Sequence, residues 1–85
     1  MPFILPKAAV DAAFNYLKEL IPVGKISNVR IEELRPATEE TKQFWHVVLS
    51  YDALGDLPFE SKREYKEFKI DGESGLVISM TIKKV

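Results

Sequence analysis

The chain of 85 residues has no cysteine and only one histidine. The first absence excludes disulfides, thiolate chemistry and cysteine-ligated zinc, and the second excludes a cluster of histidines around a metal. Neither sign of charge is in excess, because 12 basic and 13 acidic residues give a net charge of −1. We therefore expect no nucleic acid and no anionic membrane surface as a partner.

The sequence also lacks a long apolar segment. No apolar run approaches the length that crosses a bilayer. A signal peptide begins with basic residues, which a continuous apolar segment follows. Here no basic residue precedes the short run Phe3–Leu5, and Lys7 and Asp11 interrupt the apolar segment after it. We expect a soluble protein in the cytoplasm, or outside it if a leader has been removed.

The composition is typical of one small folded domain over residues 1–85, with 46% hydrophobic and 29% charged residues. Apolar residues recur at helical spacing over about 6–21 and predict a helix there. Its apolar stripe consists of Val10, Ala13, Phe14, Leu17, Leu20 and Ile21. Pro6 is tolerated in the first turn, and Pro22 and Gly24 end the helix.

Alternation of apolar and polar residues predicts four strands after the helix. Their expected ranges are about 26–35, 41–52, 62–71 and 75–85. Pro36 ends the first of them. In the second, the more apolar of the two alternating rows consists of Trp45, Val47, Leu49 and Tyr51. A tight turn at Asp71–Gly75 joins the last two strands, since its residues tolerate positive φ.

These elements predict an α+β fold in which one N-terminal helix packs on a four-stranded antiparallel meander sheet. Sequential strands with short connections pair as neighbours, and the helix is the available cover for one face. The expected core consists of Phe14, Leu17, Val29, Ile31, Trp45, Val47, Leu49, Phe68, Ile70, Leu76, Ile78 and Met80.

The final hairpin, Phe68–Ile78, carries a family resemblance. Its order of aromatic residue, hydrophobic residue, Asp and Ser-Gly resembles the closing hairpin of PepSY domains, and the alanines of the helix, Ser27–Leu34 and Phe44–Tyr51 add to the pattern. The chain is thus similar to PepSY or PepSY-like domains. That resemblance implies a cystatin-like α+β fold, no enzymatic machinery and a bias towards protein binding. Because the matched motif is a turn, no functional residue is carried over.

The residues themselves form no recognisable catalytic, metal or cofactor site. His46 and Ser50 share one strand face about 13 Å apart, at ~3.3 Å per residue, which is too far for a base to activate a nucleophile. Asp52, Asp56 and Glu60 surround a loop, but their spacing differs from that of a calcium-binding loop and is typical of a solvated turn. We predict a protein that is not an enzyme, with no catalytic residue, no cofactor and no metal.

The candidate interface lies on the outer face of the predicted sheet. If the more apolar row of the second strand points inward, the opposite row faces outward, where no helix covers it. The candidate residues are Phe44, His46, Val48, Tyr65 and Val77. Contiguous exposed apolar surface marks binding and oligomer interfaces. Scattered apolar residues rimmed by charges are equally compatible with an ordinary solvent-facing sheet, and a shift of one residue exchanges the two faces.

Three functions remain open at this point. The first is a small protein- or peptide-binding module that acts through the outer sheet face or a sheet edge, with an unknown partner. The second is a small-ligand-binding domain with a pocket between helix and sheet, although the inward residues look large enough to fill that space. The third is a scaffold whose only role is self-association, for example as a homodimer.

Overall fold

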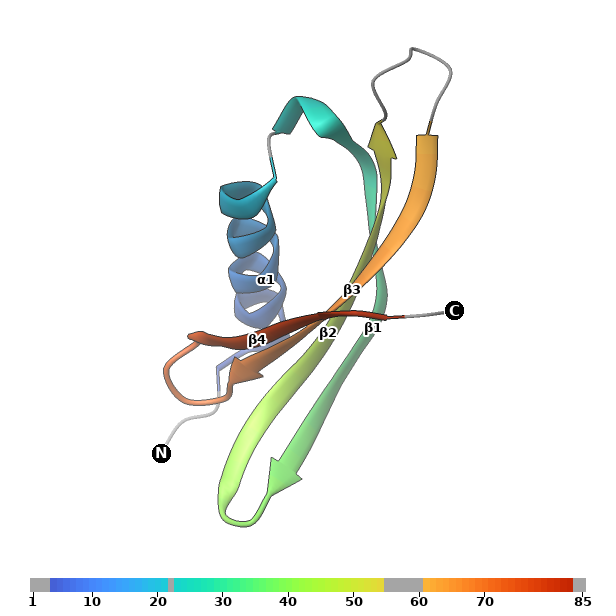
Figure 1. The fold of residues 1–85 in the computed structure, drawn as a ribbon. Coiled ribbons are helices and arrows are strands. Elements are labelled where there is room, and N and C mark those ends of the chain that lie inside the picture. Colours follow the sequence, from blue (N-terminus) through green and yellow to red (C-terminus); the bar gives the residue numbers. More distant parts are fainter. Residues whose placement is uncertain (1–3, 22, 55–60, 84–85) are drawn as a thin grey trace.

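The computed structural model describes residues 4–21, 23–54 and 61–83 (Figure 1). Its elements are α1 (Pro6–Leu20), a short 3-10 helix η1 (Val23–Lys25), β1 (Ile26–Glu39), β2 (Lys42–Leu54), β3 (Ser61–Asp71) and β4 (Val77–Ile82). The predicted helix and four strands are all present, and residues 84–85 of the predicted last strand lie outside the described residues. No helix in the described ranges is long and apolar enough to cross a membrane.

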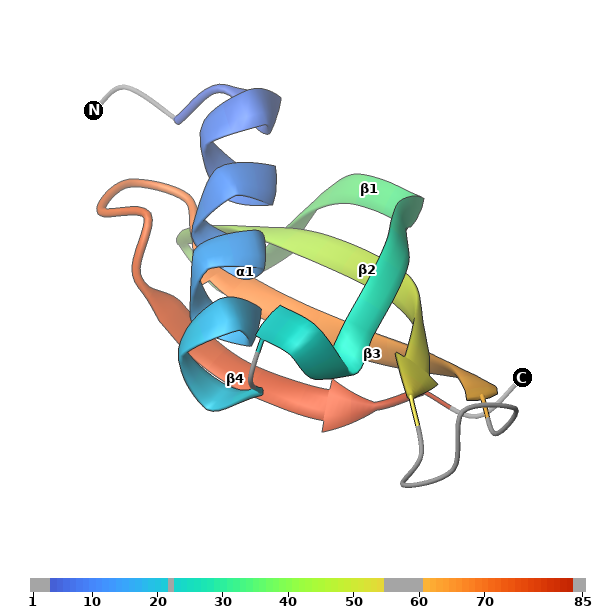
Figure 2. The ribbon, with the colours of Figure 1, turned by 90° about the horizontal axis from the view of Figure 1, so that it is seen from above.

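The four strands form one antiparallel sheet in the order β1-β2-β3-β4, and α1 lies on one face of it (Figure 2). The helix contacts β2 and β3 more than the two edge strands. We call the face towards α1 the inner face and the opposite one the outer face. The predicted α+β layout, with one helix packed on a four-stranded antiparallel sheet, is confirmed.

The core lies between α1 and the inner face. Its buried members are Ala9, Ala13, Leu17, Trp45, Val47, Leu49, Tyr51, Phe68 and Ile70. Partly exposed residues that pack against it include Phe14, Val29 and Met80. The expectation that Ile31, Leu76 and Ile78 are buried is wrong, because they are 55%, 69% and 51% exposed. Since α1 lies mainly over the two central strands, it gives these edge positions little cover.

The first strand is longer than predicted, because it continues through Pro36. Proline removes a backbone donor, and an edge strand tolerates this loss where the nitrogen faces away from the neighbouring strand. Pro36 lies opposite Trp45 in the β1–β2 ladder. The ladder also contains two register shifts, between Ser27 and Arg30 and between Ile31 and Glu33. An interior strand would not accommodate these irregularities as readily.

The turn between β3 and β4 is fixed by Asp71, and the predicted tight turn is confirmed. The Asp71 Oδ1 accepts hydrogen bonds from the backbone N–H groups of Glu73 at 2.8 Å and Ser74 at 3.0 Å. These two bonds hold the pKa of Asp71 below its ordinary value, and the bond from Ser74 contributes most. Gly75 has a φ of 78°, a left-handed conformation that glycine adopts without a steric penalty.

The residues before α1 tie the helix to the sheet. The Ile4 N–H donates to the Gly72 carbonyl at 2.7 Å, and the Trp45 Nε1–H donates to the Ile4 carbonyl at 3.0 Å. Ile4 also packs against the core. The buried indole therefore has a hydrogen-bond acceptor for its one donor.

Candidate functional site

The outer face of the sheet differs from the predicted apolar patch. Phe44 is 6% exposed and Val48 is 2% exposed, so the expectation that they are accessible is wrong. His46 and Tyr65 are half-buried. Val77 pairs with Ile70 and packs against the core, so its predicted place on the outer face is also wrong. A binding role for these five residues stays a prediction, but it lacks the accessible apolar surface that motivated it.

Long charged side chains extend across the outer face of the sheet. The Lys69 ammonium lies 4.3 Å from the centre of the Phe44 ring and donates to Glu39 at 2.6 Å. Lys83, which follows β4, approaches Glu33 of β1 to 3.9 Å. Lysine stems cover apolar surface while their ammonium groups stay near solvent. The ring of Phe44 is therefore covered by one of the protein's own side chains.

Arg63 on β3 joins three strands through hydrogen bonds. Its guanidinium donates to Ser50 Oγ at 2.7 Å, to Asp52 Oδ1 at 3.1 Å and to the Asn28 carbonyl at 2.8 Å. Ser50 is completely buried and donates its own hydroxyl proton to Glu32. Arginine suits this place because its guanidinium presents several donors in a fixed plane.

Asp52 belongs to the same cluster and is held in its ionised form. Asn28 Nδ2 donates to Asp52 Oδ2 at 2.8 Å. The hydrogen bonds from Asn28 and then from Arg63 hold the pKa of Asp52 below its ordinary value. Asn28 itself has a φ of 54°, and asparagine tolerates this left-handed conformation better than most residues. The groups of this cluster bind one another, so the cluster braces the sheet.

His46 and Ser50 do not form a base and nucleophile pair. The hydrogen bonds of Ser50 go to Glu32 and Arg63, and its burial keeps a substrate from reaching the hydroxyl. His46 Nδ1 is buried without a hydrogen-bond partner in the described part of the chain, 3.8 Å from Glu67.

Of the three loop carboxylates singled out in the sequence, Asp52 binds Asn28 and Arg63. Asp56 and Glu60 lie outside the described residues. Within the ranges 4–21, 23–54 and 61–83, no three histidine, aspartate or glutamate side chains come together in a way that could hold a metal ion.

One buried tyrosine on the inner face has a strongly shifted acidity. Tyr51 is completely buried and donates from its hydroxyl to Glu64 Oε1 at 3.1 Å. Burial raises the pKa of Tyr51 to about 12, and the hydrogen bond and charge of Glu64 act in the same direction. At neutral pH the phenol is therefore protonated and serves as a hydrogen-bond donor rather than as an acid or base.

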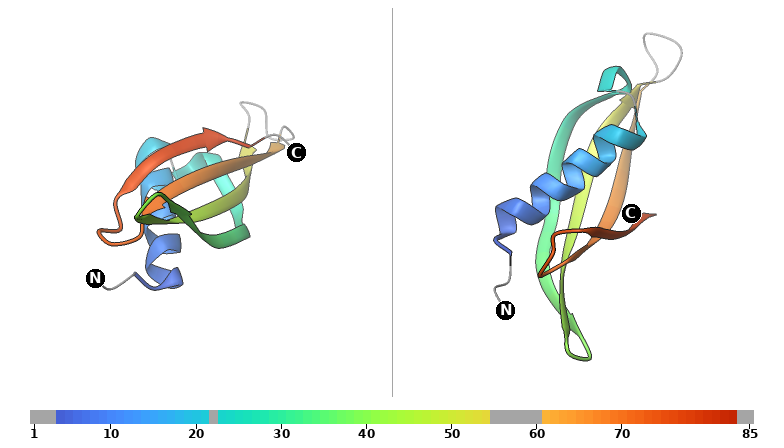
Figure 3. Two further views of the ribbon diagram at one scale, coloured as in Figure 1. Left: turned by 90° about the horizontal axis from the view of Figure 1, so that it is seen from below. Right: turned by 90° about the vertical axis from the view of Figure 1, so that its left-hand side faces the viewer.

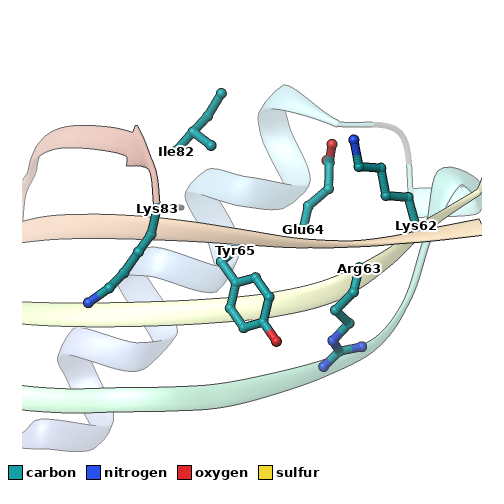
Figure 4. A pocket seen from close by; sticks show the side chains of 6 residues that line it. All are labelled: Lys62, Arg63, Glu64, Tyr65, Ile82 and Lys83. Atoms are coloured by element: carbon teal, nitrogen blue, oxygen red, sulfur yellow. The ribbon is translucent and has the colours of Figure 1, made fainter. Parts of the chain in front are cut away.

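A pocket of about 260 Å³ lies where β4 ends and β3 continues (Figure 4). Its side chains leave the strands in two directions: Arg63, Tyr65 and Lys83 extend across the outer face, and Lys62, Glu64 and Ile82 point the other way. Arg63 and Glu64 are already engaged in hydrogen bonds within the sheet. The pocket thus offers no converging set of free acidic and basic groups for catalysis.

A second cavity, a groove of about 240 Å³, separates α1 from β1. Its apolar lining consists of Val10, Phe14, Val29, Ile31 and Leu49. Asp11 and Arg30 stand beside them, and Asp11 is paired with Lys7 at 3.2 Å. The groove is the counterpart of the predicted pocket between helix and sheet, although it falls below the ~300–1,000 Å³ typical of small-molecule sites.

Exposed apolar side chains gather along β4. Leu76, Ile78 and Ile82 are 69%, 51% and 72% exposed. β4 is one edge of the sheet, and among the described residues no strand lies beyond it (Figure 3). The segment Val77–Ile82 contains neither a charged residue nor a proline. An edge strand of this composition is suited to pairing with another strand.

The backbone of β4 presents hydrogen-bonding groups at this edge. The Lys83 N–H donates to the Tyr65 carbonyl of β3 at 3.0 Å. In an antiparallel ladder the N–H and C=O of one residue point to the same side of the strand, and those of the next residue point to the opposite side. The backbone groups of Thr81, two residues before Lys83, therefore also face β3. Met80 and Ile82 therefore direct their backbone groups away from the sheet, towards the position of an added strand.

The opposite edge of the sheet, β1, has the features that prevent such pairing. It contains Pro36 and two register shifts. It also carries the charged residues Arg30, Glu32, Glu33 and Arg35. Prolines, bulges and charges are the devices by which edge strands avoid unwanted partners. We therefore take Leu76–Lys83, which we call the β4 edge, as the candidate functional site.

The β4 edge was not predicted, because the alternation in the sequence placed Leu76 and Ile78 in the core. A register shift between Lys69 and Ile70 leaves Ile78 as an extra residue on β4, and strict alternation cannot foresee such a shift. The signal that was available is the uncharged run Leu76–Ile82 in the last predicted strand.

No protein-family model, no curated protein and no solved structure matches the chain. The resemblance to PepSY domains therefore stays a prediction, and the function is inferred from the geometry of the β4 edge.

Proposed function

We propose that the protein is a small non-enzymatic module that binds a protein or peptide by adding an extended segment of that partner to the β4 edge. The observation that carries this proposal is the exposure of Ile78 and Ile82 on an uncharged edge strand, with exposed Leu76 directly before it. Main-chain hydrogen bonds to Met80 and Ile82 would supply affinity, and alternate side chains of the partner would supply specificity.

A groove between α1 and β4 supports recognition of side chains. It has a volume of about 310 Å³. The helix contributes Ala12, Asn15, Tyr16 and Glu19, and the chain before and within β4 contributes Gly75, Leu76 and Val77. A strand added to β4 continues the sheet on this side, so its inward-facing side chains would lie against the groove. The expected ligand is an extended peptide with apolar residues at alternate positions.

The remaining polar clusters support a binding role over catalysis. Ser50, Arg63 and Asp52 bind one another on the outer face, and Tyr51 binds Glu64 on the inner face. The resemblance to PepSY domains, which are generally not enzymes, points in the same direction. A cytoplasmic location and the cystatin-like class of the fold remain our predictions from the sequence.

Selection of peptides from a random library, with the folded wild-type protein as bait, tests the proposal. We expect uncharged, strand-forming peptides whose binding is lost in Ile78→Lys and retained in Ile31→Lys. Ile31 is a matched control because it is 55% exposed, against 51% for Ile78, and lies on the opposite edge strand. Peptides that bind both variants equally, or a library that yields no binders, would contradict the proposal.

A second candidate function is favoured by the groove between α1 and β1, which is lined mainly by apolar residues. A small apolar molecule bound there would raise the melting temperature, because it binds only the folded state. A thermal-shift screen on wild type and Ile31→Lys tests this candidate. Stabilisation of wild type that disappears in Ile31→Lys would favour the groove, and the absence of stabilisation would count against it.

A further inference from the structure

We infer that the partner of the β4 edge is a second copy of this chain, joined by antiparallel pairing of two β4 strands about a two-fold axis. The homodimer rests on the proposed function, because it names the occupant of the same edge. It moves self-association from the outer face, where Phe44 and Val48 are buried, to an edge beyond which no strand lies among residues 4–21, 23–54 and 61–83.

The charge pattern of β4 is compatible with pairing with its own copy. Val77–Ile82 is uncharged, Glu73 precedes it and Lys83 follows it. Antiparallel pairing reverses one copy, so the end with Glu73 in one protomer lies beside the end with Lys83 in the other. Along the strands no like charges face each other, because Val77–Ile82 is uncharged in both copies. Ile78, midway between Glu73 and Lys83, lies near the two-fold axis.

The difference between the two sheet edges favours a closed dimer. Pairing of β4 with β1 of another copy would be heterologous and would leave free edges that continue into an open fibre. Pro36, the two register shifts and the charges of β1 oppose that contact. Pairing of β4 with β4 is isologous and uses the same edge of each copy, which has no proline or charge in its described strand. Such pairing closes at a dimer.

The apolar side chains also fit a reciprocal arrangement. Each copy exposes Leu76 in its own groove between α1 and β4, which Ala12 and Tyr16 help to line. The added β4 strand of the other copy places its apolar side chains next to this groove. Each protomer then covers apolar surface that the other leaves exposed, and the two sheets become one continuous sheet.

Sedimentation equilibrium from micromolar to millimolar concentration tests the homodimer on wild type, Ile78→Lys, Ile82→Pro and the control Ile31→Lys. Ile78→Lys places two ammonium groups near the axis, and we expect self-association to weaken by about tenfold or more. Ile82→Pro removes an N–H that faces away from β3, so it blocks the added strand while the β3–β4 ladder stays intact. Circular dichroism verifies that each variant is folded.

A wild-type dimer that dissociates in Ile78→Lys and Ile82→Pro but persists in Ile31→Lys is the expected result. A dimer that persists in the folded edge variants overturns the inference, because another surface then holds it. A wild-type monomer up to millimolar concentration also overturns it. If wild type is a monomer, peptides that bind wild type and not Ile78→Lys would still support peptide binding at the β4 edge. A monomer that also binds no such peptide would contradict both the homodimer and the proposed function.

Discussion

Replacing Tyr51 with phenylalanine removes one hydroxyl from the core and leaves the ring in place. That hydroxyl donates to Glu64 Oε1 at 3.1 Å, and Tyr51 is completely buried. A hydrogen bond to a charged group contributes roughly 1.5–3 kcal/mol, and water at the half-buried Glu64 compensates for part of its loss. At neutral pH we therefore expect Tyr51→Phe to lower the free energy of unfolding by about 1–2 kcal/mol.

At alkaline pH this difference is expected to shrink and then reverse. The folded-state pKa of Tyr51 is raised from 10.0 to about 12, chiefly by burial. Above the unfolded-state pKa the unfolded chain loses the phenol proton while the folded chain keeps it, so wild type is destabilised as pH rises. The stability linked to the raised pKa is complete below about pH 10 and is lost by about pH 12. A difference of one pKa unit between the folded and unfolded states corresponds to ~1.4 kcal/mol. Because solvent at Glu64 screens the interaction, we expect the free energy of unfolding of wild type to fall by about 2 kcal/mol.

Urea unfolding of wild type and Tyr51→Phe, followed by far-ultraviolet circular dichroism between neutral pH and about pH 12, measures both effects. Tyr65→Phe, on the outer face, is the control for the removal of a phenol. We expect the free-energy difference between wild type and Tyr51→Phe to be constant up to about pH 10 and to fall beyond it. A difference that stays constant throughout the range would refute the role assigned to the Tyr51–Glu64 pair.

Two further substitutions test the outer-face cluster and the last turn. Arg63→Met keeps the apolar stem and removes the donors to Ser50 and Asp52, so we expect a loss of about 2 kcal/mol in urea unfolding. Combined with Ser50→Ala, the loss should be less than additive; strict additivity would contradict a shared network. Gly75→Ala forces a β-carbon into a φ of 78° and should cost about 1–2 kcal/mol. Gly24→Ala is the control, because its β-carbon would meet nothing within 4 Å, and it should change the free energy of unfolding by less than about 0.5 kcal/mol. Equal effects at the two glycines would contradict the need for a left-handed residue at Gly75.

The central elements of the fold were predictable because their sequence patterns are regular. The row Trp45, Val47 and Leu49 alternates without interruption and lies in the core as expected. Residues 71–75 carry the turn chemistry that the structure uses. In each case local propensity and burial favour the same conformation.

The edges and the outer face were harder to predict. Pro36 reads as a strand breaker, and only its place on an edge strand makes it acceptable. Phe44 reads as exposed, because a sequence does not reveal that Lys69 lies over its ring. Ile78 reads as buried until the register shift beside it is known. Each of these outcomes depends on contacts between strands that are distant in the sequence.

Backbone amide hydrogen exchange along β4, measured by NMR in dilute and concentrated protein, tests the central claim most directly. In dilute protein we expect the amides of Met80 and Ile82 to exchange rapidly and those of Ser79 and Thr81 slowly, because only the latter pair face β3. At high concentration, or with a selected peptide, Met80 and Ile82 should become protected. Slow exchange of Met80 and Ile82 in dilute protein, or no added protection under either condition, would contradict strand addition at the β4 edge.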